Sequence, residues 1–102
     1  MAQANNLIAE IDAQIAANKI MVYSKSTCPH CSSTKQLLQQ KGYAFEIVEL
    51  NNVANGGDIQ NALQQKTGQR TVPNIFINGE HVGGNQELVT ANRNGALDRA
   101  LA

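Results

Sequence analysis

The sequence contains no tryptophan, and aromatic residues make up only 4% of its 102 residues. Apolar residues nevertheless account for 42% and charged residues for 16%, the composition of a globular chain rather than a disordered or fibrous one. We therefore expect a mostly aliphatic core. Because a chain of this length can bury one core but not two independently stable ones, we expect residues 1–102 to form a single domain.

The chain also lacks an excess of charge and a long apolar run. Eight basic and eight acidic side chains cancel, so there is no overall positive field to attract phosphate backbones or anionic lipid, and we expect no nucleic-acid partner. No apolar stretch approaches the roughly 18 residues of a membrane span. We accordingly expect a soluble monomer with no membrane partner.

An export signal is not evident at the N-terminus. The first basic residue is Lys19, and the helix-like stretch before it carries Glu10 and Asp12, where an apolar or acid-free segment would be expected. We therefore expect a cytoplasmic protein. In that compartment, two cysteines three positions apart are more often catalytic or metal-binding than a permanent disulfide.

Helix and strand patterns alternate in the first half of the chain. Residues 5–18 carry apolar side chains at helical spacing, with Asn5 or Asn6 available as the N-cap. Residues 20–23 form a short continuous apolar run, as a strand buried on both faces would, and residues 45–50 resemble a second strand.

Between these two strands the sequence predicts a helix over residues 29–41. Pro29 has the fixed φ that suits a first helical position, and Gly42 follows the last turn. Cys28 then becomes the N-cap, directly after a strand. A strand–helix–strand unit is usually a right-handed parallel crossover, which indicates an α/β fold.

The second half of the chain predicts a helix, a hairpin and two short helices. These elements are expected at residues 58–66, 74–82, 86–93 and 96–101. Asp58 can cap the first of these helices, and Gly68 can end it. Asn78-Gly79 is a strong signal for a tight antiparallel hairpin, and Asn94-Gly95 separates the two short helices.

Cys28 and Cys31 lie one helical turn apart, which brings their Cβ atoms to about 5–6 Å, close to what a disulfide requires. At the N-cap, Cys28 faces unpaired backbone N–H groups and the positive end of the helix dipole, which favour the thiolate. Cys31 is expected to be less exposed and less ionised. The pattern predicts that Cys28 attacks and Cys31 resolves the mixed disulfide. Lys25 either adds positive potential here or is a solvated surface lysine.

Two structural interpretations of the cysteine pair compete with redox chemistry. A four-residue disulfide loop gains on the order of 2 kcal/mol in the chain-entropy model, against about 3 for a fifteen-residue loop, which is a weak reason to keep a permanent bridge. Zinc needs four protein ligands, and the remaining candidates are His30 and the distant His81. The strand-to-helix setting favours redox chemistry, and we expect no metal.

Three ordered motifs in this chain resemble the glutaredoxin family, and most closely its eukaryotic dithiol branch with Cys-Pro-x-Cys. The motifs are Ser24-Lys25-Ser26-Thr27-Cys28-Pro29-His30-Cys31, then Gly68-Gln69-Arg70-Thr71-Val72-Pro73-Asn74, and then Ile77-Asn78-Gly79 with His81-Val82-Gly83-Gly84-Asn85. The resemblance implies a thioredoxin fold, an α/β architecture with a central four-stranded mixed sheet flanked by helices. It also implies a glutathione-dependent disulfide oxidoreductase that reduces protein–glutathione mixed disulfides and protein disulfides. Electrons would come from glutathione and, through it, from glutathione reductase.

The same resemblance implies a glutathione site. Its expected residues are Lys25, His30, Gln60, Arg70, Thr71, Val72, Pro73, Gly84, Asn85 and Gln86. Lys25 and Gln60 would hold the glycine carboxylate, with Arg70 contributing at longer range. The Val72 backbone, preceding a cis bond to Pro73, would pair with the cysteinyl part. Gln60 and Arg70 also have a simpler interpretation as ordinary surface groups.

The other end of glutathione would meet the helix that begins at Gly84, Asn85 and Gln86. Free N–H groups at a helix start bind carboxylates, here the γ-glutamyl one, although a simple turn also explains the glycines. Two residues depart from the family pattern. His30 replaces a common tyrosine and introduces a titratable group beside the thiols. Gln86 replaces a common acidic residue, which weakens an expected contact with the glutathione ammonium.

Two other functions remain open at this point. An iron–sulfur cluster carrier would use Cys28 from two chains together with two glutathiones. Family members of that type generally lack the proline that stands here at position 29. A thioredoxin would normally have a tryptophan before the motif, which is absent from this chain.

Overall fold

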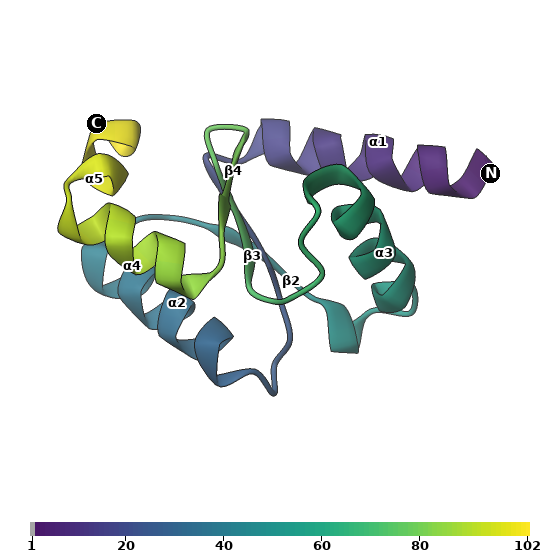
Figure 1. The fold of residues 1–102 in the computed structure, drawn as a ribbon, viewed down its shortest axis with the longest axis horizontal. Helices are drawn as coiled ribbons and strands as arrows, with labels where there is room; N and C mark the ends of the chain where they lie inside the picture. The colour runs from purple at the N-terminus through teal and green to yellow at the C-terminus, as the bar shows by residue number, and fades with distance from the viewer. Residues whose placement is uncertain (1) are drawn as a thin grey trace.

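A computed structural model describes residues 2–102, with side chains described from Asn6 onward, and places a four-stranded sheet at the centre (Figure 1). The strands are β1 (Ile20–Ser24), β2 (Glu46–Glu49), β3 (Asn74–Ile77) and β4 (Glu80–Gly83), in the order β2-β1-β3-β4. β1 runs parallel to β2 and antiparallel to β3, and β3 runs antiparallel to β4. The expected mixed sheet is thus confirmed.

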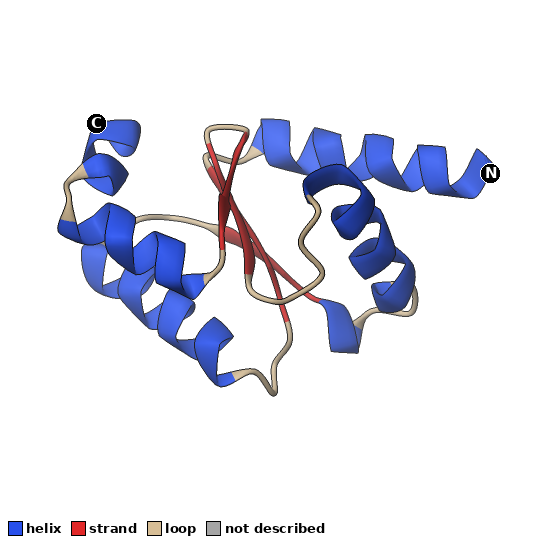
Figure 2. Cartoon of the chain, in the orientation of Figure 1, coloured by secondary structure: helices blue, strands red, loops and turns tan. Residues whose placement is uncertain are grey.

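Helices cover both faces of this sheet (Figure 2). They are α1 (Ala2–Ala17), α2 (Pro29–Lys41), α3 (Gly56–Thr67), α4 (Asn85–Arg93) and α5 (Ala96–Leu101), with a short 3₁₀ helix η1 (Leu50–Asn52) before α3. α1 and α3 pack together on one face, and α2, α4 and α5 pack on the other. No helix in the described part of the chain has the length and apolar character needed to cross a membrane.

Strand β1 is buried along its whole length, which explains its continuous apolar sequence. Met21 and Tyr23 belong to the core between the sheet and α1 and α3. Ile20 and Val22 belong to the core on the opposite face, with α2, α4 and α5. Because side chains alternate along a strand, the next residue, Ser24, faces α2.

Two helix starts differ from the sequence-based prediction by two residues or more, and α4 begins one residue earlier than expected. α1 begins at Ala2 rather than residue 5, so Asn5 and Asn6 lie inside the helix and neither is its N-cap. α3 begins at Gly56, so Asp58 lies in its first turn and is not the cap. Packing against η1 extends α3 by two residues, since Gly56 lies directly against the η1 backbone. An acidic side chain still suits that first turn because of the helix dipole.

Local signals predicted other boundaries correctly. α2 spans residues 29–41 as expected, and Gly42 ends it in the left-handed conformation at φ 75°. In the β3–β4 hairpin, Asn78 and Gly79 both have positive φ, at 53° and 82°. Two consecutive residues of this kind form the tight turn that matches the natural twist of paired strands.

Candidate active site

The two cysteines lie at the start of α2, just past the carboxyl end of β1. Cys28 is the N-cap with an extended backbone, and its Sγ accepts a hydrogen bond from the Cys31 N–H at 3.3 Å. Both cysteines are free thiols. A helix-start N–H donor stabilises negative charge on sulfur. The N-cap position predicted for Cys28 is confirmed.

The surroundings of the two sulfurs differ, as predicted. Cys28 is partly exposed, whereas Cys31 is 0% exposed. Burial raises the pKa of the Cys31 thiol, and contact with Cys28 raises it further, against smaller opposing effects of Ser24 and the Lys25 backbone. Cys31 is therefore protonated, as a thiol, at neutral pH.

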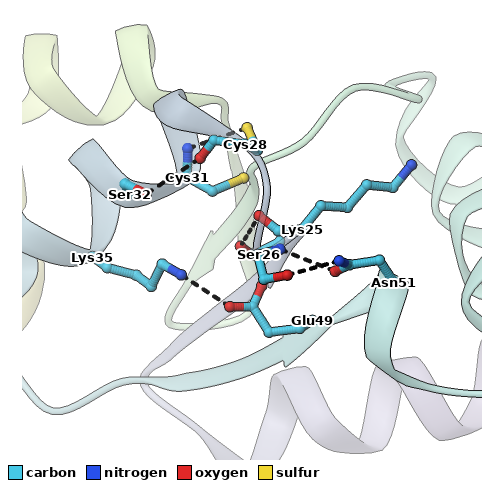
Figure 3. Close-up of polar contacts among 9 residues, drawn as sticks. Lys25, Ser26, Cys28, Cys31, Ser32, Lys35, Glu49 and Asn51 are labelled. Atoms are coloured by element: carbon cyan, nitrogen blue, oxygen red, sulfur yellow. Dashed lines mark hydrogen bonds and ion pairs between the residues drawn. The ribbon is translucent and has the colours of Figure 1, made fainter.

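The loop between β1 and α2 is held by hydrogen bonds to its own backbone and to η1 (Figure 3). Cys28 N donates to Lys25 O at 3.0 Å. The Ser26 N–H donates to Asn51 Oδ1 at 3.0 Å, and Asn51 Nδ2 donates to Ser26 Oγ at 2.7 Å. In Figure 3 the Lys25 side chain extends away from both sulfurs. Lys25 is thus available to a bound ligand rather than to Cys28 itself.

A second loop, residues 69–73, lies beside Cys28. The Cys28 thiol contacts the Val72 carbonyl oxygen at 3.7 Å, and the bond from Val72 to Pro73 is cis, as the resemblance implied. Gln69 Nε2 donates to Thr71 O and to Pro73 O, both at 3.0 Å. Gln69 thus braces the carbonyls on either side of Val72. Sequence reasoning assigned it no role, because a glutamine in a loop carries no distinctive signal.

Gln60 and Arg70 are brought together, but each is bonded within the protein. Gln60 Nε2 donates to Arg70 O at 2.8 Å. The Arg70 guanidinium donates to the side chains of Asn61 and Gln64, so it lies along α3. Gln60 Nε2 still has a second hydrogen, and the guanidinium still has its Nε and Nη2 donors, so both side chains keep donors for a carboxylate.

The start of α4 lies next to the same loop, since a Cβ on Gly84 would lie 3.6 Å from Pro73 O. The Gly84 N–H, expected to be free for a ligand, donates instead to Glu87 Oε1 at 2.7 Å. Asn85 Oδ1 accepts from Thr34 Oγ1 at 2.9 Å, which ties α4 to α2. Exposed Gln86 follows in the first turn, where N–H groups have no partner within the helix.

His30 lies in the first turn of α2 with an exposed side chain, immediately after Pro29. Within the described residues, no group of three or more His, Cys, Asp or Glu side chains is arranged to hold a metal ion.

A polar cluster beneath the cysteines was missed by sequence reasoning. Lys35 Nζ and Glu49 Oε2 form an ion pair at 2.9 Å (Figure 3). Burial acts to raise the pKa of Glu49, but the Ser24 hydroxyl and Lys35 outweigh it, so the pKa lies below its ordinary value. The available signal was an acidic residue at the end of a half-buried strand. Its partners could be known only from the register of the sheet.

Comparison with known proteins decides the family. The glutaredoxin family model matches residues 20–82. A glutaredoxin from Vernicia fordii is 47% identical over 92 residues, which are 88% of each chain. The chain belongs to the glutaredoxin family. It is accordingly a glutathione-dependent thiol oxidoreductase with the thioredoxin fold.

Solved structures of glutaredoxins agree with this assignment. The buckwheat glutaredoxin–glutathione complex matches with a TM-score of 0.94 at 38% identity, covering 98% of this chain and 91% of that one. Wheat glutaredoxin matches with a TM-score of 0.90 at 42% identity, covering 93% of this chain and 90% of that one. The likeness therefore extends over nearly the whole chain.

Proposed function

We propose that this chain reduces protein–glutathione mixed disulfides and protein disulfides, with Cys28 as the attacking thiol and Cys31 as the resolving thiol. The unequal surroundings of the two sulfurs carry this proposal. Cys28 Sγ is partly exposed and accepts the Cys31 N–H, whereas Cys31 is fully buried. The partners proposed for the chain are glutathione, proteins bearing disulfides, and glutathione reductase acting through glutathione. We propose that the chain acts as a monomer in the cytoplasm.

The first step is attack by the Cys28 thiolate on the glutathione sulfur of a mixed disulfide. The substrate's S–S bond breaks, the client protein leaves as a thiolate, and a Cys28–glutathione disulfide forms. A second glutathione then attacks this disulfide, which releases oxidised glutathione and restores Cys28. The Cys31 N–H favours Cys28 both as a nucleophile and as a leaving group, because it stabilises charge on Sγ in each case.

Protein disulfides use the second thiol. Once Cys28 is bonded to a client, Cys31 attacks Cys28 Sγ, the client thiolate leaves, and a disulfide between Cys28 and Cys31 closes. Two glutathiones then reduce that disulfide. The buried Cys31 can reach Cys28 but not a client in solution, which separates the roles of the two thiols.

We further propose that the loop at Val72 and the start of α4 form the two ends of the glutathione site. The Val72 backbone, 3.7 Å from Cys28 Sγ through its carbonyl, would pair with the cysteinyl part. The N–H groups following Gly84 would bind the γ-glutamyl carboxylate. Lys25, and Gln60 through the second hydrogen of its Nε2, would hold the glycine carboxylate.

Serine replacements test the assignment of roles in a glutathione-coupled assay with two substrates, a glutathionylated peptide and a protein disulfide. Cys28→Ser is expected to lose both activities, because the attacking sulfur is gone. Cys31→Ser should keep turnover of the glutathionylated peptide and lose reduction of the protein disulfide. Activity that survives Cys28→Ser would overturn the proposal.

A further inference from the structure

The sheet places a buried hydroxyl next to a partly buried carboxylate on the face that α2 covers. Ser24 and Glu49 are register partners in the parallel pairing of β1 and β2. Val22 and Ile47, two residues before each of them, both pack in the core beneath α2. Because strand side chains alternate, Ser24 and Glu49 face α2 together.

On α2, Cys31 and Lys35 are separated by one turn and lie on the side that meets this pair. Lys35 Nζ bonds Glu49 Oε2 at 2.9 Å, with side chains that are 25% and 22% exposed (Figure 3). Cys31 and Ser24 are both 0% exposed. The resolving thiol therefore lies over a hydroxyl, a carboxylate and an ammonium, with little access to water.

Hydrogen bonding in this cluster is incomplete. Glu49 Oε1 is buried without a hydrogen-bond partner. The Ser24 hydroxyl makes one long contact, to Lys25 O at 3.4 Å. Buried acceptors are normally satisfied, and a serine hydroxyl has a single proton that it can rotate toward different acceptors. The single hydroxyl proton of Ser24 thus lies near more acceptors than it can bond at one time.

We propose that Ser24 is a positioning residue for the resolving step: its hydroxyl, which donates to Lys25 O while Cys31 is a thiol, turns to Cys31 Sγ when the thiolate forms, with Glu49 Oε1 as a competing acceptor. This inference rests on the proposed function, since it concerns the second half of the dithiol route. The Ser24 hydroxyl takes the place of the water that cannot reach the buried sulfur.

The step balances without any further reagent. The Cys31 thiolate attacks Cys28 Sγ, the bond between Cys28 and glutathione breaks, and glutathione leaves as a thiolate that takes up the proton released by Cys31. The cysteine pair is oxidised to a disulfide, and glutathione is reduced to its thiol.

Glu49 is not assigned as the base for this step. Cys28 is the titratable group in contact with Cys31, and the Glu49–Lys35 ion pair lies on the same face of the sheet. Burial, followed by contact with Cys28, raises the pKa of Cys31, whereas Ser24 and Lys35 hold the pKa of Glu49 below its ordinary value. Proton transfer from Cys31 to Glu49 is therefore unfavourable, because the thiol holds its proton more tightly and the carboxylate accepts one less readily than usual. Glu49 acts instead as the competing acceptor for the Ser24 proton.

The test follows release of glutathione after rapid mixing of the reduced full-length chain with excess oxidised glutathione, over a range of pH. Attack by Cys28 releases one equivalent, and resolution by Cys31 releases a second. Cys31→Ser identifies the second phase by abolishing it. If the wild-type chain itself shows no second phase, the proposed dithiol route fails, whatever Ser24 does.

Ser24→Ala is expected to slow the second phase about three- to fivefold at neutral pH and to raise its apparent pKa, with the first phase unchanged. Losing a hydrogen bond to a charged group lowers the thiolate population about tenfold or more. The greater nucleophilicity of the more basic thiolate raises the rate about threefold and offsets part of this loss. Ser24→Thr retains the hydroxyl and should restore the pH profile.

Two further variants separate this role from a structural one. Tyr23→Phe removes a buried hydroxyl on the opposite face of the same strand, where it bonds Gln14 Oε1 at 2.6 Å, and should leave the second phase unchanged. Glu49→Gln offers a weaker competing acceptor and should lower the apparent pKa of the second phase. An unchanged pH profile in Ser24→Ala, or a slower second phase in Glu49→Gln, would overturn the assignment.

Discussion

Cys28 and Cys31 are chemically identical residues that the fold places in different surroundings. One is partly exposed at a helix N-cap, and the other is enclosed between α2 and the sheet. Neighbouring residues then extend this difference. Gln69 braces the carbonyls flanking Val72, beside the partly exposed sulfur. Ser24, as proposed above, positions the buried one. At the scale of single residues, function therefore depends on which polar group each sulfur meets.

Replacing Gln69 by methionine should weaken substrate binding, because two hydrogen bonds that brace the Val72 loop are lost. At about 0.5–1.5 kcal/mol for each hydrogen bond, we expect KM for a glutathionylated peptide to rise several-fold. Steady-state kinetics measure this, with Gln65→Met at an exposed site on α3 as the matched control. An unchanged KM in Gln69→Met would show that the loop keeps its shape without this side chain.

At the scale of elements, η1 and α3 support the catalytic loop from the side. Asn51 of η1 holds Ser26, and η1 in turn lies against the first residue of α3. A Cβ placed on Gly56 would lie 1.7 Å from Leu50 O, a backbone atom that cannot rotate away. Only glycine allows this approach. The contact explains why α3 starts two residues earlier than its sequence predicts.

Gly56→Ala and Gly57→Ala form a matched pair at this junction. Gly56→Ala should destabilise the chain by about 1–3 kcal/mol or more, since the added methyl forces η1 and α3 apart. Gly57→Ala meets no atom within 4 Å and should stabilise it by roughly 0.4–1 kcal/mol, because the unfolded chain loses freedom. Urea unfolding of both variants measures these changes, and equal stabilities would contradict the packing argument.

At the scale of the whole molecule, the β3–β4 hairpin joins the site to the edge of the sheet. His81 on β4 bonds Asn74 on β3, with Nε2 and Oδ1 2.9 Å apart, and Asn74 begins the strand that follows the Val72 loop. Burial lowers the pKa of His81, and the opposing effect of Glu87 does not restore it. The folded chain therefore favours neutral His81 more strongly than the unfolded chain does.

This shift predicts a pH-dependent stability. Because the unfolded state binds the His81 proton more readily, the contribution is present above the ordinary histidine pKa of about 6.5 and is lost as pH falls from there toward the folded-state pKa. The free energy of unfolding should thus be lower at pH 5.5 than at pH 7.5. Urea unfolding at both pH values checks this, and His81→Gln should reduce the difference. An equal difference in the variant would mean that other groups cause it.

Sequence alone determined the features that depend on neighbouring residues. Pro29 and Gly42 bound α2, Asn78-Gly79 makes the hairpin turn, and the N-cap position of Cys28 follows from both. Each of these features depends on backbone conformations that a few adjacent residues dictate. The three ordered motifs, in addition, indicated the glutaredoxin family.

Tertiary structure decided the features that join distant segments. The start of α3 depends on its contact with η1, and the occupied N–H of Gly84 depends on how Glu87 folds back. The meeting of Ser24, Glu49 and Cys31 depends on the register between β1 and β2 and on how α2 lies across them. Strand register and helix docking are set by packing of the whole core, so no local pattern in the sequence could show that the resolving thiol lies over a buried hydroxyl.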